Sequence, residues 1–168
     1  MYTKPVEIFT YRINVLSEKL ILPPSPSQVR QSAIQLLARR EHSRVELHQK
    51  LQQRGYPKEL IEEQLTKLVN QGLLSDQRFA ENYIRSRSNK GYGPVRIINE
   101  LQQRGVVEEI IATFMNEITK DWFQLAEQVR QKRFGKKIPA DFAEKAKQIR
   151  FLQYRGFDMA QITKIMAR

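Results

Sequence analysis

Leu101-Gln102-Gln103-Arg104-Gly105 is the middle one of three similar phrases in this chain of 168 residues. The same five residues occur earlier as Leu51-Gln52-Gln53-Arg54-Gly55, and Leu152-Gln153-Tyr154-Arg155-Gly156 follows with one change. The glycines that end the phrases are 50 and 51 residues apart. A fixed period of this length is typical of tandem structural repeats. The sequence therefore predicts three similar units.

Each phrase has the composition of a helix C-terminus. A glycine just past the last turn adopts the left-handed conformation without a steric penalty from a Cβ atom. The arginine before it complements the negative end of the helix dipole. We therefore predict that one helix of each unit ends at its phrase, and that Arg54, Arg104 and Arg155 are helix-end caps rather than binding residues.

The remaining signals predict three helices in each unit. Ser43 and Glu46 form a capping box at the start of one helix, Pro57 suits the first position of the next, and Ser75 caps a third. No segment shows the alternation typical of strands. The predicted fold is all-α: an elongated tandem array of three three-helix, helix-turn-helix-like repeats. The expected helices include residues 33–40, 107–118, 121–133 and 140–155.

We expect the chain to divide into an N-terminal extension at 1–27 and repeats at 32–75, 76–120 and 121–168. Apolar residues recur at helical spacing between Phe9 and Leu20, although the same stretch would suit a strand equally well. The prolines within 23–26 predict a stiff linker after it.

The chain is strongly basic, with 29 Lys and Arg against 18 Asp and Glu and a formal net charge of +11. Residues 121–168 hold eleven basic and five acidic residues and so supply +6 of it. A surplus of this size favours a polyanionic partner through release of counterions. We expect no membrane contact and a cytoplasmic location, because no apolar run reaches about 18 residues and charges interrupt the N-terminal stretch. The lack of cysteine excludes disulfides and thiolate catalysis.

The sequence contains no recognisable active site. Gly135-Lys136-Lys137 lacks the upstream glycine of a phosphate-binding P-loop. His42 and His48 are the only histidines, and they have no acidic neighbours at metal-ligand spacing, so we expect both to be ordinary surface residues. We predict that the protein is not an enzyme and holds no metal and no cofactor.

The turn Gly91-Tyr92-Gly93-Pro94 is one candidate for nucleic-acid binding. It resembles the hairpin of helix-hairpin-helix units, whose exposed N–H groups bind anions. A plain turn into a helix that starts at Pro94 also explains these residues. In either role we expect valine at Gly93 to be harmful, because it would forbid a positive φ angle.

A basic cluster in the last repeat is the second candidate. Lys147 and Arg150 share a helical face with Tyr154, an arrangement that suits phosphate contact combined with base stacking, so we expect the main DNA contact there. A solvated face that improves solubility is the alternative.

Helical geometry sorts the arginines of the preceding repeat. Arg87 falls on the same side as Phe79 and Tyr83, so we expect it to pack at the edge of the core. Arg78 and Arg85 fall on the opposite side and are expected to be free for a ligand.

Three stretches of the sequence resemble the bacterial RecX family of recombinase regulators. The most distinctive runs from Asp76-Gln77-Arg78-Phe79-Ala80 through Arg85-Ser86-Arg87 to Lys90-Gly91-Tyr92-Gly93-Pro94. Ser43-Arg44-Val45-Glu46-Leu47 is similar to the family's first-repeat motif, and Arg150-Phe151-Leu152 with Arg155-Gly156-Phe157 is similar to its last. The resemblance covers roughly residues 32–168.

The resemblance implies a tandem array that lodges in the groove of the RecA–DNA filament. It further implies restraint of RecA's ATP hydrolysis, strand exchange and co-protease activity and, for some members, direct DNA binding. We therefore expect a monomeric regulator of DNA recombination and repair, with the RecA filament and single- and double-stranded DNA as partners. A stand-alone DNA-binding protein remains an alternative, as does a nuclease, which the missing metal ligands oppose. The expected RecA and DNA contacts are Arg78, Arg85, Lys90, Tyr92, Arg96, Arg130, Lys132, Arg133, Lys136, Lys137, Lys147, Arg150 and Tyr154.

Overall fold

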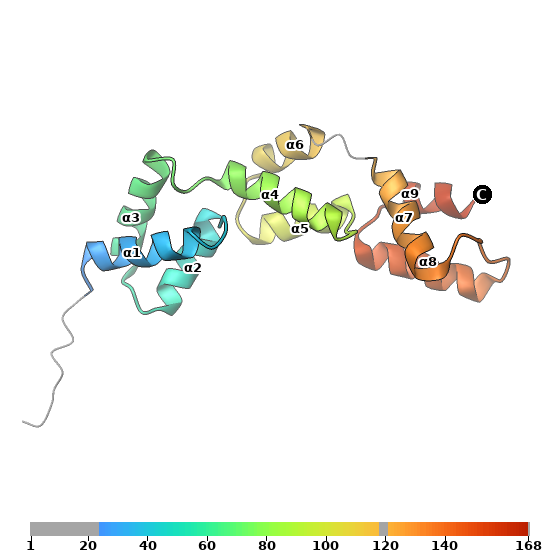
Figure 1. Cartoon of the computed structure of the whole chain (residues 1–168), viewed down its shortest axis with the longest axis horizontal. Coiled ribbons are helices and arrows are strands. Elements are labelled where there is room, and N and C mark those ends of the chain that lie inside the picture. Colours follow the sequence, from blue (N-terminus) through green and yellow to red (C-terminus); the bar gives the residue numbers. More distant parts are fainter. Residues whose placement is uncertain (1–23, 118–120, 168) are drawn as a thin grey trace, which may run out of the picture.

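The computed structural model describes residues 24–117 and 121–167, and in these ranges it consists of α-helices and connecting turns. The helices follow one another as three groups along the long axis of the molecule (Figure 1). Repeat 1 comprises α1 (Pro26–Leu37), α2 (Arg44–Gln53) and α3 (Lys58–Asn70). Repeat 2 comprises α4 (Asp76–Asn89), α5 (Pro94–Gln103) and α6 (Glu108–Glu117). Repeat 3 comprises α7 (Trp122–Phe134), α8 (Phe142–Arg155) and α9 (Met159–Met166). The all-α, three-repeat prediction is confirmed.

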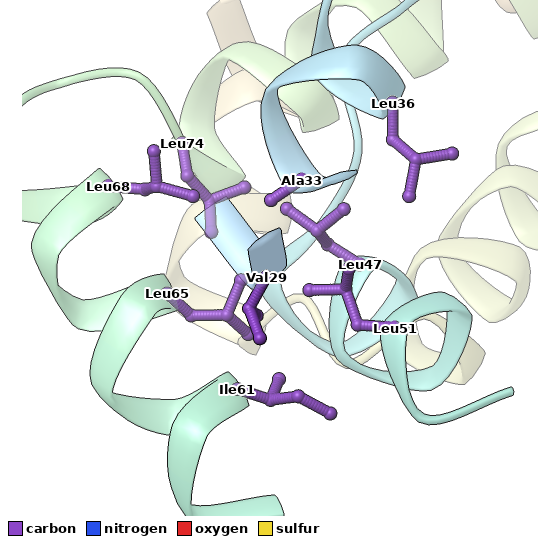
Figure 2. Packing of buried hydrophobic residues seen from close by; sticks show 9 residues of the cluster. All are labelled: Val29, Ala33, Leu36, Leu47, Leu51, Ile61, Leu65, Leu68 and Leu74. Atoms are coloured by element: carbon purple, nitrogen blue, oxygen red, sulfur yellow. The ribbon is translucent and has the colours of Figure 1, made fainter. Parts of the chain in front are cut away.

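Each repeat has its own hydrophobic core. Val29 of α1, Leu51 of α2 and Leu65 of α3 are fully buried in the core of repeat 1 (Figure 2). Separate clusters fill repeats 2 and 3, around Ile97 and Ile162 respectively. The three cores stay separate and follow one another in a row, so the molecule is elongated (Figure 1).

The first described helix begins earlier than predicted. α1 starts at Pro26, although the sequence predicts a linker at residues 23–26 and a helix from residue 33. Ser25 caps α1 by accepting the N–H of Gln28, whose side chain binds back to the Ser25 N–H. Pro26 occupies the first helical position, where its missing N–H costs nothing. The helix expected between Phe9 and Leu20 lies outside the described residues.

The repeats join through the ends of their second helices. At the junction of repeats 2 and 3, the N–H of Gly93 donates to the carbonyl of Arg155 at 2.8 Å, and the N–H of Val95 donates to the carbonyl of Gly156 at 3.1 Å. At the junction of repeats 1 and 2, the Ser43 hydroxyl donates to the carbonyl of Arg104 at 2.7 Å. Free donors at the start of one helix thus meet free acceptors at the end of another, and the helix dipoles align.

The recurring glycine closes each junction. Gly105 and Gly156 have φ angles of +73° and +87°, as predicted for helix ends. A Cβ atom at Gly105 would lie 2.3 Å from the Val45 side chain, and one at Gly156 would lie 2.2 Å from Arg96 Cβ. Gly55, the equivalent residue of repeat 1, has nothing within 4 Å of such an atom. The glycine therefore has a second role, close approach between repeats, at two of its three occurrences.

The predicted capping box at α2 forms only in part. The Ser43 hydroxyl accepts the N–H of Glu46 at 3.0 Å. The Glu46 carboxylate instead pairs with Arg40 at 2.8 Å. A residue of repeat 2 contributes to the same helix end, because the Asp76 carboxylate accepts the N–H of Arg44 at 2.7 Å.

Candidate nucleic-acid interface

Arginine and tyrosine side chains alternate across repeat 2 and into repeat 3. The Arg87 guanidinium lies over Tyr83 at 5.3 Å and over Tyr92 at 4.8 Å. The Arg96 guanidinium lies over Tyr92 at 4.5 Å and over Tyr154 at 5.2 Å. These distances are typical of cation–π contacts. We name as the arginine–tyrosine array the residues Arg104, Tyr83, Arg87, Tyr92, Arg96 and Tyr154.

Glu100 of α5 holds the array together. Its carboxylate accepts hydrogen bonds from the Tyr83 hydroxyl at 2.8 Å, from Arg87 Nε at 2.7 Å and from Arg96 Nε at 3.0 Å. Burial alone would raise the pKa of Glu100, but hydrogen bonds from Arg96 and Tyr83 and the charge of Arg87 outweigh it and lower the pKa below its ordinary value. Arg87 is thus a structural partner at the core edge, as predicted.

Two of the three predicted helix-end arginines have roles beyond capping. Arg104 Nη1 donates to the carbonyl of Glu100 in the last turn of α5, as a cap would. Arg54 instead binds the Ser32 hydroxyl of α1. Arg155 crosses the repeat junction, where Nη1 donates to the carbonyl of Lys90 at 3.1 Å and the guanidinium lies over Tyr92 at 5.2 Å. Both stand at helix ends as predicted, Arg54 at the C-cap of α2 and Arg155 in the last turn of α8. Each also reaches a partner that only tertiary packing brings near, so capping is not the sole role of either.

Two open grooves flank the array where repeats 2 and 3 meet. The α5–α8 groove has a volume of about 430 Å³ and is lined by Arg96, Asn99, Gln103, Gln153 and Tyr154, among others. The basic groove, of about 440 Å³, lies between the end of α4, α7 and α8. Among the described residues, four cations and no carboxylate line the basic groove: Lys90, Lys132, Arg133 and Arg155.

The turn between α4 and α5 is engaged within the protein. The N–H of Gly93 is bonded to repeat 3, and Pro94 is the first residue of α5. The anion-binding explanation of this turn therefore lacks its donor, and the plain helix-entry explanation holds. Gly93 has an ordinary φ of −86°, so the predicted need for a positive φ is also wrong. A Cβ atom there would lie 2.4 Å from the carbonyl oxygen of Gly156, so close approach is the real requirement.

The cations of repeat 2 that were expected to be free are paired. Arg78 Nε lies 2.8 Å from a Glu41 oxygen, and Arg78 Nη1 donates to the carbonyl of Gly72. Arg85 pairs with Glu81, one turn away, at 2.9 Å. Their side chains do point away from the core of repeat 2, but carboxylates already neutralise both.

Most exposed cations in the described part of repeat 3, unlike Arg78 and Arg85, have no carboxylate partner. Lys147 pairs weakly with Glu144 at 3.3 Å, and both side chains are more than half exposed. The exposed cations without an ion pair in the described part of repeat 3 are Lys132, Arg133, Lys136, Lys137, Arg150 and Lys164. The surplus of positive charge predicted for this repeat is therefore available at its surface.

Arg130 does not belong to the surface. It is fully buried, and its guanidinium binds Glu127 at 3.0 Å, Gln148 at 3.3 Å and the carbonyl of Lys136 at 3.0 Å. These contacts tie α7 to α8 and to the turn between them. Because it is buried, Arg130 is not a contact for DNA or protein, and that prediction is wrong. The basic run around it gave no indication of burial.

The structure gathers six of the predicted contact residues around the junction of repeats 2 and 3: Lys90, Tyr92, Arg96, Lys132, Arg133 and Tyr154. It places the remaining exposed ones outside the two grooves: Arg78, Arg85, Lys136, Lys137, Lys147 and Arg150. Sequence reasoning missed Tyr83, Arg104 and Arg155 as members of the same surface. For Arg104 and Arg155 the available signal was their recurrence just before the glycines of the repeated five-residue phrase, which we interpreted as capping alone.

The histidines do not form a metal site. His42 is buried, contrary to prediction, and its Nδ1 lies 2.9 Å from the carbonyl oxygen of Arg40. Burial, followed by the charge of Arg40, lowers the pKa of His42. His48 Nε2 lies 3.3 Å from a Glu62 oxygen. Across residues 24–117 and 121–167, no group of three or more potential ligands is placed to hold a metal ion, and no helix is long and apolar enough to span a membrane.

Comparison with known proteins identifies the family. Models of the first, second and third three-helix domains of RecX match residues 30–68, 75–115 and 120–166. Regulatory protein RecX of Pseudomonas entomophila is 49% identical over 85% of this chain and 92% of its own length. Regulatory protein RecX of Halorhodospira halophila is 47% identical over 80% of this chain and 83% of its own.

Solved structures share the fold. A crystal structure of RecX from Lactobacillus salivarius superposes with a TM-score of 0.70 at 22% identity, over 84% of this chain and 94% of that one. A crystal structure of a regulatory protein RecX gives a TM-score of 0.74 at 24% identity, over 85% of this chain and 73% of that one. The domain matches and the relatives above 45% identity confirm the resemblance seen in the sequence. The chain belongs to the RecX family of regulatory proteins.

Proposed function

We propose that this protein regulates the RecA recombinase by binding the RecA–DNA filament, and that it thereby inhibits RecA's ATPase, strand exchange and co-protease activities. Membership of the RecX family supports a regulatory role without catalysis. The cytoplasm, where RecA and DNA are found, is the location that this role requires.

The observation that carries the proposal is the cationic surface at the junction of repeats 2 and 3. The basic groove offers four cations without a carboxylate, and the arginine–tyrosine array adds guanidinium groups beside aromatic rings. A polyanionic filament is the partner that such a surface favours. The extended arrangement of repeats suits a long contact with a filament, because repeat arrays present continuous surfaces.

The proposed contacts fall into two groups by position. The central contacts are those at the junction: Lys90, Tyr92, Arg96, Lys132, Arg133 and Tyr154. Outlying contacts at Arg78, Arg85, Lys136, Lys137, Lys147 and Arg150 would add electrostatic attraction, with Arg78 and Arg85 first having to leave their carboxylates.

The direct test is RecA's DNA-dependent ATPase in the presence of this protein. At a ratio well below one protein per RecA subunit, we expect the steady-state rate of ATP hydrolysis to fall. The reason is that one elongated molecule of three repeats would span several subunits of the filament. A rate that stays at the RecA-alone value up to equimolar protein would overturn the proposal. Duplex binding that needs no RecA, together with an unchanged ATPase, would instead support the stand-alone DNA-binding alternative.

A further inference from the structure

The third helices of repeats 1 and 2 do not suit the reading of duplex DNA. In helix-turn-helix proteins the second helix of the motif enters the major groove, and phosphate contacts depend on cations. The helix in the equivalent place in repeat 2, α6, carries Glu108, Glu109 and Glu117 and no Lys or Arg. In repeat 1, α3 carries three glutamates against two lysines. α6 is therefore repulsive to a duplex, and α3 offers it no surplus of cations.

The α5–α8 groove has the chemistry of a nucleobase site. Tyr154 is 74% exposed, with the Arg96 guanidinium stacked on its ring, so a flat, polarised surface faces the solvent. The side chains of Asn99 and Gln103 line the same groove, and neither has a hydrogen-bond partner within the described part of the chain. A carboxamide offers both donors and an acceptor, so it can pair with the edges of different bases.

Phosphate-binding groups lie beside this groove. The last turn of α8 separates the two grooves, with Gln153 and Tyr154 on one side and Phe151 and Arg155 on the other. A strand that places a base in the α5–α8 groove would therefore have neighbouring phosphates near the cations of the basic groove. Alternation of stacking surfaces and cations is typical of proteins that bind single strands.

We propose that the α5–α8 groove binds an unpaired base of single-stranded DNA, stacked on Tyr154, while Lys132 and Arg133 in the basic groove bind adjacent phosphates. This inference specifies the ligand of the surface used in the proposed function and rests on it. In a duplex the bases stack on one another, so the Tyr154 ring has no free base face to contact. The protein on its own therefore prefers single-stranded DNA to duplex.

The test uses the full chain without RecA. Fluorescence anisotropy with a labelled oligodeoxythymidylate, and with a duplex of the same length, gives both affinities over a range of salt. We expect Tyr154→Ala to weaken single-strand binding roughly tenfold, to leave duplex binding unchanged, and to keep the salt slope. Tyr154→Phe retains the ring and should bind as the wild type does. Phe142→Ala removes another exposed aromatic from α8, 84% exposed and at its other end, and should also leave binding unchanged.

The phosphate contacts give a different signature. Lys132→Glu with Arg133→Glu should weaken single-strand binding and lower the slope of log affinity against log salt by about 0.7 for each lost contact. Unchanged melting temperatures would show that the exposed-site variants remain folded.

Several results would overturn the inference while leaving the regulatory role intact. One is full single-strand affinity in Tyr154→Ala. Another is a Tyr154→Ala protein that loses RecA inhibition but keeps its DNA affinity, which would assign the groove to a RecA surface. A wild type that inhibits RecA but binds no oligonucleotide alone would also overturn it. Conversely, Tyr154-dependent single-strand binding without RecA inhibition would support the base site and contradict the proposed function.

Discussion

Glu100 joins three side chains of the arginine–tyrosine array through a carboxylate that is 13% exposed. We predict that Glu100→Gln lowers the free energy of unfolding by about 1–3 kcal/mol, because charge-assisted hydrogen bonds to half-buried arginines are lost. Urea unfolding at pH 7 measures this change. Glu81→Gln is the matched control, since it breaks an exposed pair with Arg85 and should cost about 0.5 kcal/mol or less.

The Glu100 effect should depend on pH in a defined direction. Its pKa in the folded protein lies below that of the unfolded chain, so the stabilisation is fully present above the unfolded value of about 4.3. It is lost as the pH falls through the lower folded pKa, because the carboxylate then takes up a proton in both states. The unfolding free energies of wild type and Glu100→Gln should therefore converge in strong acid. A constant difference down to pH 2 would mean that charge is not the cause.

His42 should make stability sensitive to mild acid. Its pKa in the folded protein is lowered, so between that value and the unfolded value near 6.5 the unfolded chain binds the additional proton. Stability contributed by the neutral ring is present above pH 6.5 and falls as the pH drops below it. We predict that the wild type loses more stability than His42→Gln between pH 7 and pH 5. An equal loss of unfolding free energy in the two proteins over this pH range would contradict the role given to His42. His48→Gln is the control for the other histidine.

At the scale of the helices, the junction between α8 and α5 makes the sharpest prediction. Gly156→Ala would place a methyl group 2.2 Å from Arg96 Cβ, and the residue would also keep an unfavourable φ of +87°. We expect the free energy of unfolding to fall by about 2–4 kcal/mol. We also expect a larger radius of gyration in solution scattering, because repeat 3 would separate from repeat 2.

Gly55→Ala isolates the backbone contribution. Gly55 has a similar φ of +82°, but a Cβ atom there meets nothing within 4 Å. Gly55→Ala should lower the free energy of unfolding by about 1–2 kcal/mol and leave the radius of gyration unchanged. If both substitutions have equal effects on stability and size, the glycines serve only as helix ends.

Helix ends were predicted best where a single residue determines them. Ser75 caps α4 and Gly105 ends α5 as expected, because capping depends on local backbone donors and acceptors. The start of α1 was missed because the prolines near Pro26 are equally common in linkers and in first helical turns. Those local signals could not distinguish the two.

The candidate site was predicted only in part, because its contacts join distant residues. Arg96 and Tyr154 are 58 positions apart, so no periodicity within one helix could pair them. Arg130 was misplaced because burial of a cation depends on partners such as Gln148, which the fold supplies. The surplus of positive charge in repeat 3 was visible in the sequence, since it depends on composition alone.

At the scale of the whole molecule, three cores are joined by short contacts between helix ends. The exact bounds of the repeats, 32–75, 76–120 and 121–168, stay a prediction. The sequence favours Lys147 and Arg150 as the main charged contacts, whereas the geometry favours Lys132 and Arg133 in the basic groove.

The most direct measurement is RecA's DNA-dependent ATPase with three proteins at one substoichiometric ratio: wild type, Lys132→Glu with Arg133→Glu, and Lys147→Glu with Arg150→Glu. Both double variants reverse two charges in the same repeat, so any difference between them reports position rather than net charge. We predict strong inhibition by the wild type, somewhat weaker inhibition by the Lys147 and Arg150 variant, and little inhibition by the Lys132 and Arg133 variant. Full inhibition by a folded Lys132 and Arg133 variant would contradict the role of the basic groove, and no inhibition by the wild type would contradict the proposed function.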